Sequence, residues 1–156
     1  MTNIYLFDWG DTLMVDLKGI PGPMCNWEVV KTVDGAFETL DYLSKHSLIY
    51  IATGAEESDE EDIKKAFARV NLSQFISGYF CKTNLGVSKG EPDFLPRIIR
   101  KLGKPVSDIA MVGDNFDKDI KPALAVGIQP IWFSKSAEHR GSVNVQVISE
   151  LQELCV

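Results

Sequence analysis

The sequence has no apolar run of the about 18 residues that a membrane-spanning helix requires. Its three cysteines, Cys25, Cys81 and Cys155, form no CxxC pair and no cluster with histidine, which argues against a zinc site or a disulfide framework. Basic residues are also scarce: 16 lysines and arginines stand against 22 aspartates and glutamates, a net charge of −6. This charge argues against non-specific binding to nucleic acid. Because the N-terminus also begins directly on an apolar strand with no signal peptide, we expect a cytoplasmic protein.

What the sequence does contain is typical of one globular domain spanning residues 1–156. Hydrophobic residues make up 45% of the chain and charged residues 24%, enough for a single core with a hydrated surface. Predicted strands cover 3–7, 48–52, 78–81, 109–112 and 128–133, and predicted helices cover 34–45, 58–70, 93–102 and 118–126. Residues 143–147 suggest an edge strand, followed by a terminal helix from Ser149. Strands that alternate with helices predict an α/β fold with a mostly parallel sheet.

Two of the predicted strands end abruptly in an aspartate, Asp8 after the first and Asp114 after the fourth. The carboxyl ends of parallel strands meet at the edge of the sheet where ligands bind. Thr53 follows the second strand, and Lys89 arrives from a separate segment. Two carboxylates, a hydroxyl and an ammonium at one edge predict a site for a divalent cation and a phosphoryl group.

The order and spacing of four stretches resemble the haloacid dehalogenase-like (HAD) superfamily of phosphohydrolases. These stretches are FDWGDTL at 7–13, IYIATG at 49–54, VSKGEPDF at 87–94 and MVGDNFDKDI at 111–120, and the resemblance runs from Tyr5 to about Phe133. It implies a Rossmann-like three-layer sandwich with a central, mostly parallel sheet. It also implies a Mg²⁺-dependent phosphomonoesterase that forms an aspartyl-phosphate intermediate, which splits one hard hydrolysis into two easier steps.

Within this resemblance, Asp8 takes the role of nucleophile. Mg²⁺ is expected on Asp8, the backbone carbonyl of Gly10 and Asp114, since this ion prefers oxygen ligands and keeps several waters. Asp119 takes a supporting role that orients the metal ligands.

The phosphate is expected to contact Thr53 and the backbone N–H of Gly54, in a turn before a helix. Lys89 is expected to neutralise charge on the phosphoryl group and on Asp8, with Lys82 as the competing candidate. Asp117 is expected to be a surface residue.

One position departs from the family pattern. Family phosphatases carry a second aspartate two residues after the nucleophile as general acid and base, and that position is Gly10 here. Asp11 follows one place later, and Gly10 permits a sharp turn that would bring the side chain of Asp11 to the expected position of the acid. Either Asp11 supplies the proton, or the site is slow, or it performs different chemistry. The alternatives are a catalytically weak or inactive phosphate-binding or interaction relative, and cleavage of a C–P or C–halogen bond.

A second departure is length, because Leu13 to Thr53 leaves no room for the substantial cap domain that most relatives insert there. The segment 14–31 is rich in glycine and proline, so we expect a loop or flap beside the site. Its apolar residues, Met14, Ile20, Met24 and Trp27, would either touch substrate or simply pack. An uncapped site favours a large or extended phosphorylated substrate, or a cover supplied by an oligomer partner.

Overall fold

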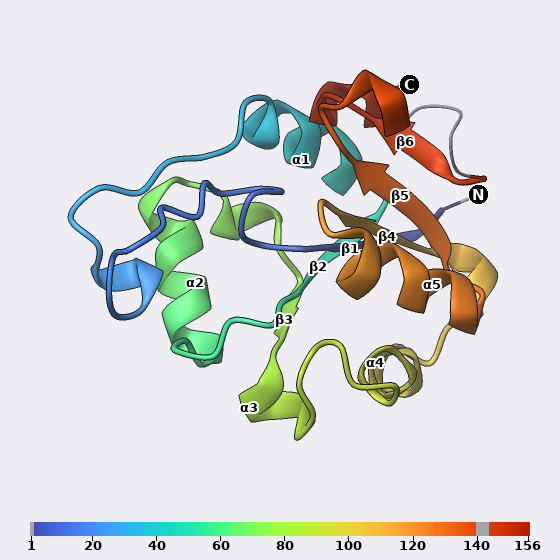
Figure 1. Cartoon of the computed structure of the whole chain (residues 1–156), viewed down its shortest axis with the longest axis horizontal. Helices are drawn as coiled ribbons and strands as arrows, with labels where there is room; N and C mark the ends of the chain where they lie inside the picture. The colour runs from blue at the N-terminus through green and yellow to red at the C-terminus, as the bar shows by residue number, and fades with distance from the viewer. Residues whose placement is uncertain (1, 140–143) are drawn as a thin grey trace.

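A six-stranded parallel sheet forms the centre of the protein in this computed structural model, which describes residues 2–139 and 144–156 (Figure 1). The strands are β1 Ile4–Phe7, β2 Leu48–Ala52, β3 Gly78–Phe80, β4 Ile109–Gly113, β5 Gln129–Phe133 and β6 Gln146–Ile148. They lie in the order β3-β2-β1-β4-β5-β6, and every neighbouring pair is parallel. The predicted α/β class is confirmed, with β1 and β4 side by side at the centre.

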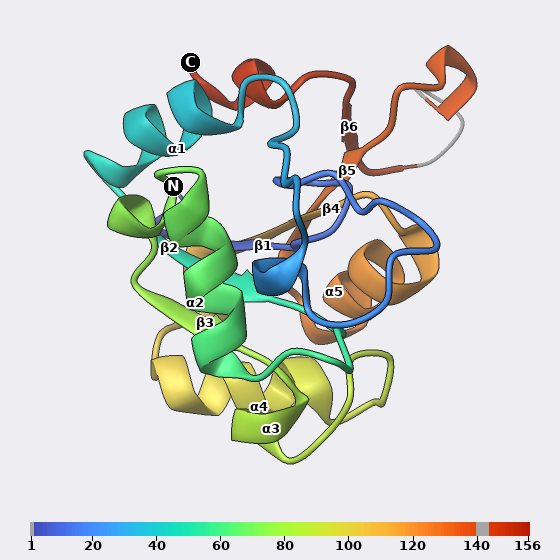
Figure 2. The same cartoon turned by 90° about the vertical axis from the view of Figure 1, so that its left-hand side faces the viewer.

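Helices cover both faces of the sheet, as a three-layer sandwich requires (Figure 2). They are α1 Ala36–Ser44, α2 Glu60–Arg69, α3 Lys82–Leu85, α4 Phe94–Leu102 and α5 Lys121–Val126. Successive strand residues point to opposite faces, so Phe7 packs in the cluster with α1 and α2 while Leu6 packs in the cluster with α4 and α5. All five residues of β4 are buried, as expected for a central parallel strand.

The second helix shows how local sequence fixes an element boundary. Its expected start at Ser58 moves to Glu60, because Asp59 caps the helix. The carboxylate of Asp59 accepts the N–H of Asp62 at 2.9 Å, and that of Asp62 accepts the N–H of Asp59 at 3.2 Å. This reciprocal capping box, with acids in the first turn, explains the acidic run that precedes the helix.

The largest differences from the expected elements lie near the C-terminus. The predicted helix 118–126 becomes a π-helical turn, Phe116–Ile120, followed by α5 with Pro122 in its first turn. The predicted edge strand 143–147 becomes Gln146–Ile148, and Val143 falls outside the described residues. The predicted terminal helix is a single 3₁₀ turn, Leu151–Leu154. None of the described helices is long and apolar enough to cross a membrane.

The segment 14–31 is anchored to α2 rather than free. The guanidinium of Arg69 donates to the carbonyl oxygens of Cys25 and Glu28, each at 3.2 Å, and to that of Trp27. Of the apolar residues in the segment, Met14, Met24 and Trp27 are buried, which favours packing, and Ile20 is 40% exposed.

Candidate active site

Asp8 and Asp114 lie one residue beyond the ends of two adjacent strands. Phe7 is in register with Val112 across β1 and β4, and the N–H of Asp8 donates to the carbonyl of Val112 at 2.9 Å. The two aspartates therefore leave the sheet at the same edge. Their predicted placement at the carboxyl ends of two buried strands is confirmed, and the structure shows that these strands are neighbours.

A tight turn after Asp8 brings a third side chain, Thr12, between the two carboxylates. The N–H groups of Leu13 and Met14 both donate to the carbonyl of Trp9, which closes the turn. The left-handed residue in it is Asp11, with φ of 61°, and not Gly10. The hydroxyl of Thr12 lies 3.2 Å from Oδ2 of Asp8 and 3.3 Å from Oδ1 of Asp114.

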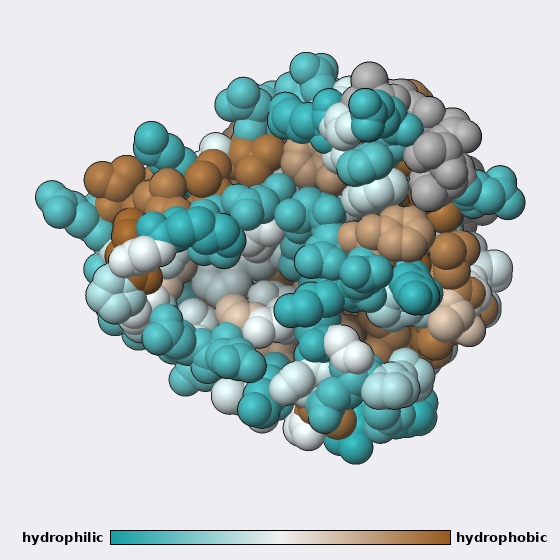
Figure 3. Space-filling view, in the orientation of Figure 1, coloured by the Kyte–Doolittle hydropathy of each residue, from teal (hydrophilic) through white to brown (hydrophobic). Residues whose placement is uncertain are grey.

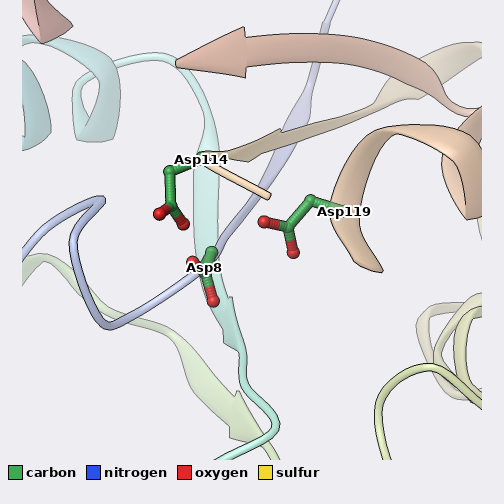
Figure 4. Close-up of side chains that lie close together, drawn as sticks. All are labelled: Asp8, Asp114 and Asp119. Carbon is green, nitrogen blue, oxygen red and sulfur yellow. The ribbon is translucent and has the colours of Figure 1, made fainter. Parts of the chain in front are cut away.

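Asp119 joins the same group from the π-helical turn. Its Oδ2 accepts the N–H of Asn115 at 3.0 Å, and its own N–H donates to the carbonyl of Asn115 at 2.8 Å. The carboxylate fills the space beside Gly113, where any Cβ would collide with it. One oxygen each of Asp8, Asp114 and Asp119 lie within 4.8 Å of one another, and the three side chains point together (Figure 4).

Lys89 links the group through a buried ammonium. Its Nζ lies 2.8 Å from Oδ1 of Asp8, 2.5 Å from Oδ1 of Asp119 and 3.0 Å from the carbonyl of Ala52. Only 5% of the Lys89 side chain is exposed. The competing candidate, Lys82, lies exposed on α3. The ammonium thus donates hydrogen bonds to Asp8 and Ala52 and forms an ion pair with Asp119, which together fix its position.

The three carboxylates differ in the direction of their pKa shifts: the pKa of Asp8 is lowered, whereas those of Asp114 and Asp119 are raised. Burial works to raise the pKa of Asp8, but the Lys89 ammonium outweighs it and holds that pKa below its usual value. Burial also works to lower the pKa of Lys89, and the charges of Asp8 and Asp119 raise it instead. Asp114 lacks such a partner, so burial, its hydrogen bond with Asp8 and the nearby charges raise its pKa to about 7. Burial likewise raises the pKa of Asp119 to about 6, although Lys89 opposes the shift.

Asp8, Lys89, Asp114 and Asp119 line a pocket of about 420 Å³. Figure 3 shows it as a hollow with mostly hydrophilic surroundings. We use "floor" for Asp8, Lys89, Asp114 and Asp119, which line the pocket, together with the buried Thr12, whose hydroxyl contacts Asp8 and Asp114. We use "rim" for the residues 16–27, of which Asp16, Lys18, Gly22, Pro23, Met24 and Trp27 line the pocket. The rim lies within the segment 14–31, for which the sequence predicted a loop or flap.

Thr53 and Gly54 line the opposite wall. The hydroxyl of Thr53 accepts the N–H of Ala55 at 3.1 Å. A Cβ on Gly54 would lie 3.1 Å from Cβ of Lys89, so the glycine lets the lysine stem pass close to the backbone. The four segments that the sequence singled out thus converge on one pocket.

Asp11 behaves differently from the other predicted site residues. Its carboxylate is partly exposed, and Oδ1 accepts the N–H of Asp16 at 3.0 Å. Sequence reasoning missed Thr12 and Asp16. Thr12 had a detectable signal, since it follows the nucleophile candidate by four residues, whereas Asp16 reaches the site only through the shape of the turn.

The donor set fits a hard divalent cation. Three carboxylates face a single ammonium at the floor, which leaves negative charge uncompensated among the described residues. Oxygen donors at this spacing are those that Mg²⁺ prefers, and the raised pKa of Asp114 has the sign expected for a ligand without its cation.

Comparison with solved structures shows the same fold in proteins of low sequence identity. The YfnB protein from Bacillus subtilis, in a structure bound to magnesium, has a TM-score of 0.78 at 14% identity, with 98% of this chain and 96% of that one covered. A 2-haloacid dehalogenase from Pseudomonas syringae has a TM-score of 0.76 at 16% identity, with 99% and 96% covered. A HAD phosphatase from Thermococcus onnurineus has a TM-score of 0.68 at 20% identity, with 80% of this chain and 57% of that one covered.

The sequence itself gives the family. No curated protein matches it significantly, but a family model described as "haloacid dehalogenase-like hydrolase" matches residues 24–127. The matched part is more than half of the chain and contains Thr53, Lys89, Asp114 and Asp119. The chain therefore belongs to the haloacid dehalogenase-like hydrolases.

Proposed function

We propose that the protein is a Mg²⁺-dependent phosphomonoesterase that acts through an aspartyl-phosphate on Asp8. The observation that carries the proposal is the pairing of Asp8 with the buried Lys89 beside Asp114 and Asp119. This pairing keeps a carboxylate ionised at the floor of the pocket. Nucleophilic attack on phosphorus needs that ionised form.

In this proposal, each residue has a distinct task. Oδ of Asp8 attacks phosphorus, and the P–O bond to the leaving group breaks. Thr53 donates its hydroxyl hydrogen to a phosphate oxygen, since its oxygen already accepts the N–H of Ala55. The N–H of Gly54 binds the same group.

Lys89 holds the nucleophile in place and offsets negative charge as the phosphoryl group arrives. Asp119 holds Lys89 in turn, through the 2.5 Å ion pair. Mg²⁺ on Asp8, the Gly10 carbonyl and Asp114 would neutralise negative charge on the phosphoryl group. Thr12 keeps Asp8 and Asp114 aligned by lying within 3.3 Å of both carboxylates.

The substrate is a phosphorylated molecule whose leaving group extends out of the pocket past the rim. The pocket volume of about 420 Å³ accommodates the phosphoryl group and part of the leaving group. We place the protein in the cytoplasm, because its three cysteines are free thiols.

Cleavage of a C–halogen bond is the second candidate, favoured by Gly10. A halide leaves without a proton, so that reaction does not need the acid that is absent at position 10. The charge of the floor favours phosphoryl transfer instead. Dehalogenation needs no metal ion, so the negative charges of Asp114 and Asp119 would have no purpose in that reaction.

A substrate panel tests the two candidates together. Purified protein with Mg²⁺ should release phosphate from at least one member of a set of phosphorylated sugars, nucleotides, phosphopeptides and p-nitrophenyl phosphate, and EDTA should abolish the release. Halide release from 2-haloacids in EDTA would support the second candidate. Metal binding without turnover of any ester or haloacid would show a binding relative that has lost its activity.

A further inference from the structure

The space beside Gly10 is occupied by the side chain of another acid, Asp16. A Cβ built on Gly10 would lie 3.3 Å from Cβ of Asp16, 3.7 Å from its Cγ and 3.6 Å from its Oδ2. An aspartate at position 10 would therefore project into the volume that Asp16 already fills. Both residues line the pocket that contains Asp8.

The turn between these residues holds Asp16 at the pocket. The N–H of Asp16 donates to Oδ1 of Asp11 at 3.0 Å, and the N–H of the preceding residue, Val15, donates to the carbonyl of Lys31 at 2.8 Å. Oδ2 of Asp16 accepts from Nζ of Lys18 at 3.0 Å. The backbone of Asp16 is thus fixed, while 42% of its side chain stays exposed to the pocket and solvent.

We propose that Asp16 is the general acid and base of the reaction, a carboxyl delivered by the rim in place of the one missing at Gly10. This inference rests on the proposed phosphatase function. In the first step, Oδ of Asp8 bonds to phosphorus, the P–O bond to the leaving group breaks, and the leaving oxygen takes the proton of the Asp16 carboxyl. In the second step, the Asp16 carboxylate takes a proton from water, the water oxygen bonds to phosphorus, and the P–O bond to Asp8 breaks.

Asp11 is less suited to this task, although it is closer in sequence to the family position. Its carboxylate is engaged with the backbone N–H of Asp16, and its left-handed φ of 61° directs the turn. Asp11 is then a positioning residue for Asp16. The ion pair between Lys18 and Asp16 is screened by solvent, because 80% of the Lys18 side chain is exposed.

The test compares two phosphate esters in the Asp16→Asn variant. p-Nitrophenolate leaves without a proton, whereas an alkoxide such as that of glycerol phosphate requires one. For the alkyl ester, kcat/KM should fall by the order of 10²-fold or more. For p-nitrophenyl phosphate, kcat/KM should fall by less than about tenfold, while kcat falls further because the aspartyl-phosphate hydrolyses slowly.

Rapid quench gives an independent readout of the second step. The Asp16→Asn variant should release one p-nitrophenolate per chain in a burst, and acid-quenched protein should carry the trapped phosphate on Asp8. Asp16→Glu, which keeps the carboxyl, should recover part of the alkyl ester activity. Asp16→Ser repeats the comparison if the asparagine variant does not fold, and Asp117→Asn is the matched control on an exposed aspartate of a neighbouring segment.

The possible failures are distinct. A wild-type protein that hydrolyses neither these two esters nor any member of the substrate panel overturns the proposed function, and the role of Asp16 with it. An active wild type whose Asp16→Asn variant loses the same factor on both esters and shows no burst overturns the role of Asp16 alone. If Asp11→Asn, and not Asp16→Asn, produces the burst and the ester difference, the general acid is Asp11.

Discussion

At the floor of the pocket, Lys89 is 5% exposed and contacts two carboxylates, whereas at the rim Lys18 is 80% exposed and pairs with Asp16 and Asp11. The ammonium–carboxylate pairing is the same in both places, but its energy differs with the solvent around it. Ion pairs in water contribute little, while buried ones are costly to break. The floor is therefore rigid and fixes Asp8, the proposed nucleophile, whereas the ion pairs of the rim can exchange partners.

The largest expected effect is at the floor, from Asp8→Asn. The amide is nearly isosteric: its oxygen can still accept from Lys89, and its NH2 group can donate to the hydroxyl oxygen of Thr12. The fold should therefore persist, but the amide is not a nucleophile. Turnover should fall below a tenth of wild type in a metal-replete assay and no phosphate should be trapped on the protein, while Asp117→Asn stays near wild type. Residual turnover above that level would remove Asp8 from the nucleophile role.

Lys89→Met should show how far the floor depends on its buried ammonium. The change leaves Asp8 and Asp119 without their cation, and removing one partner of a buried pair costs about 3–5 kcal/mol of unfolding free energy. Adding Asp119→Asn should restore part of this loss, because one uncompensated charge is then gone. Urea unfolding of the two single variants and the double variant in EDTA measures the coupling. Additive losses would mean that the two residues do not act as a pair.

The contrast between floor and rim also explains what the sequence could predict. Asp8, Thr53 and Asp114 are placed by the ends of strands, and strands are encoded by local apolar runs, so the sheet edge and its residues follow from the sequence. Asp16 is placed by the left-handed turn at Asp11 and by the hydrogen bond from the N–H of its neighbour Val15 to the carbonyl of Lys31, which depend on tertiary contacts. The π-helical turn that carries Asp119 is likewise set by the carboxylate fitting against Gly113, which no periodicity reveals.

The next effect in size is the competition between a proton and Mg²⁺ for the carboxylate of Asp114. The pKa of Asp114 lies near 7 in the folded chain against an ordinary value of 3.8. Between pH 4 and 7, Asp114 is protonated in the folded chain and ionised in the unfolded chain. Without metal, the contribution of this group to the free energy of unfolding is therefore lost as the pH rises from about 4 to 7. Asp119, with a pKa near 6, acts in the same direction.

Mg²⁺ must displace that proton, so its affinity should tighten as pH rises from 6 to about 7.5 and then level off. Calorimetric titration of Mg²⁺ at several pH values measures this, and thermal unfolding should show a larger Mg²⁺ stabilisation at pH 8 than at pH 6. Asp114→Asn should bind weakly with little pH dependence. A wild-type affinity that is flat from pH 6 to 8 would place the metal away from Asp114.

The smallest effect is expected from Arg69→Met, which loosens the rim without touching the floor. The variant loses hydrogen bonds to the carbonyls of Cys25, Trp27 and Glu28, and because Arg69 is exposed, water can replace part of them. The cost to stability should be about 1–2 kcal/mol.

KM should rise severalfold, since the buried wall formed by Met24 and Trp27 is no longer held against α2. The steady-state kcat should change little, because Asp8 and Lys89 keep their contacts, and Lys64→Met at another exposed position of α2 is the control. An equal fall of kcat in Arg69→Met would mean that the rim and the floor move as one unit, which would erase the difference between them.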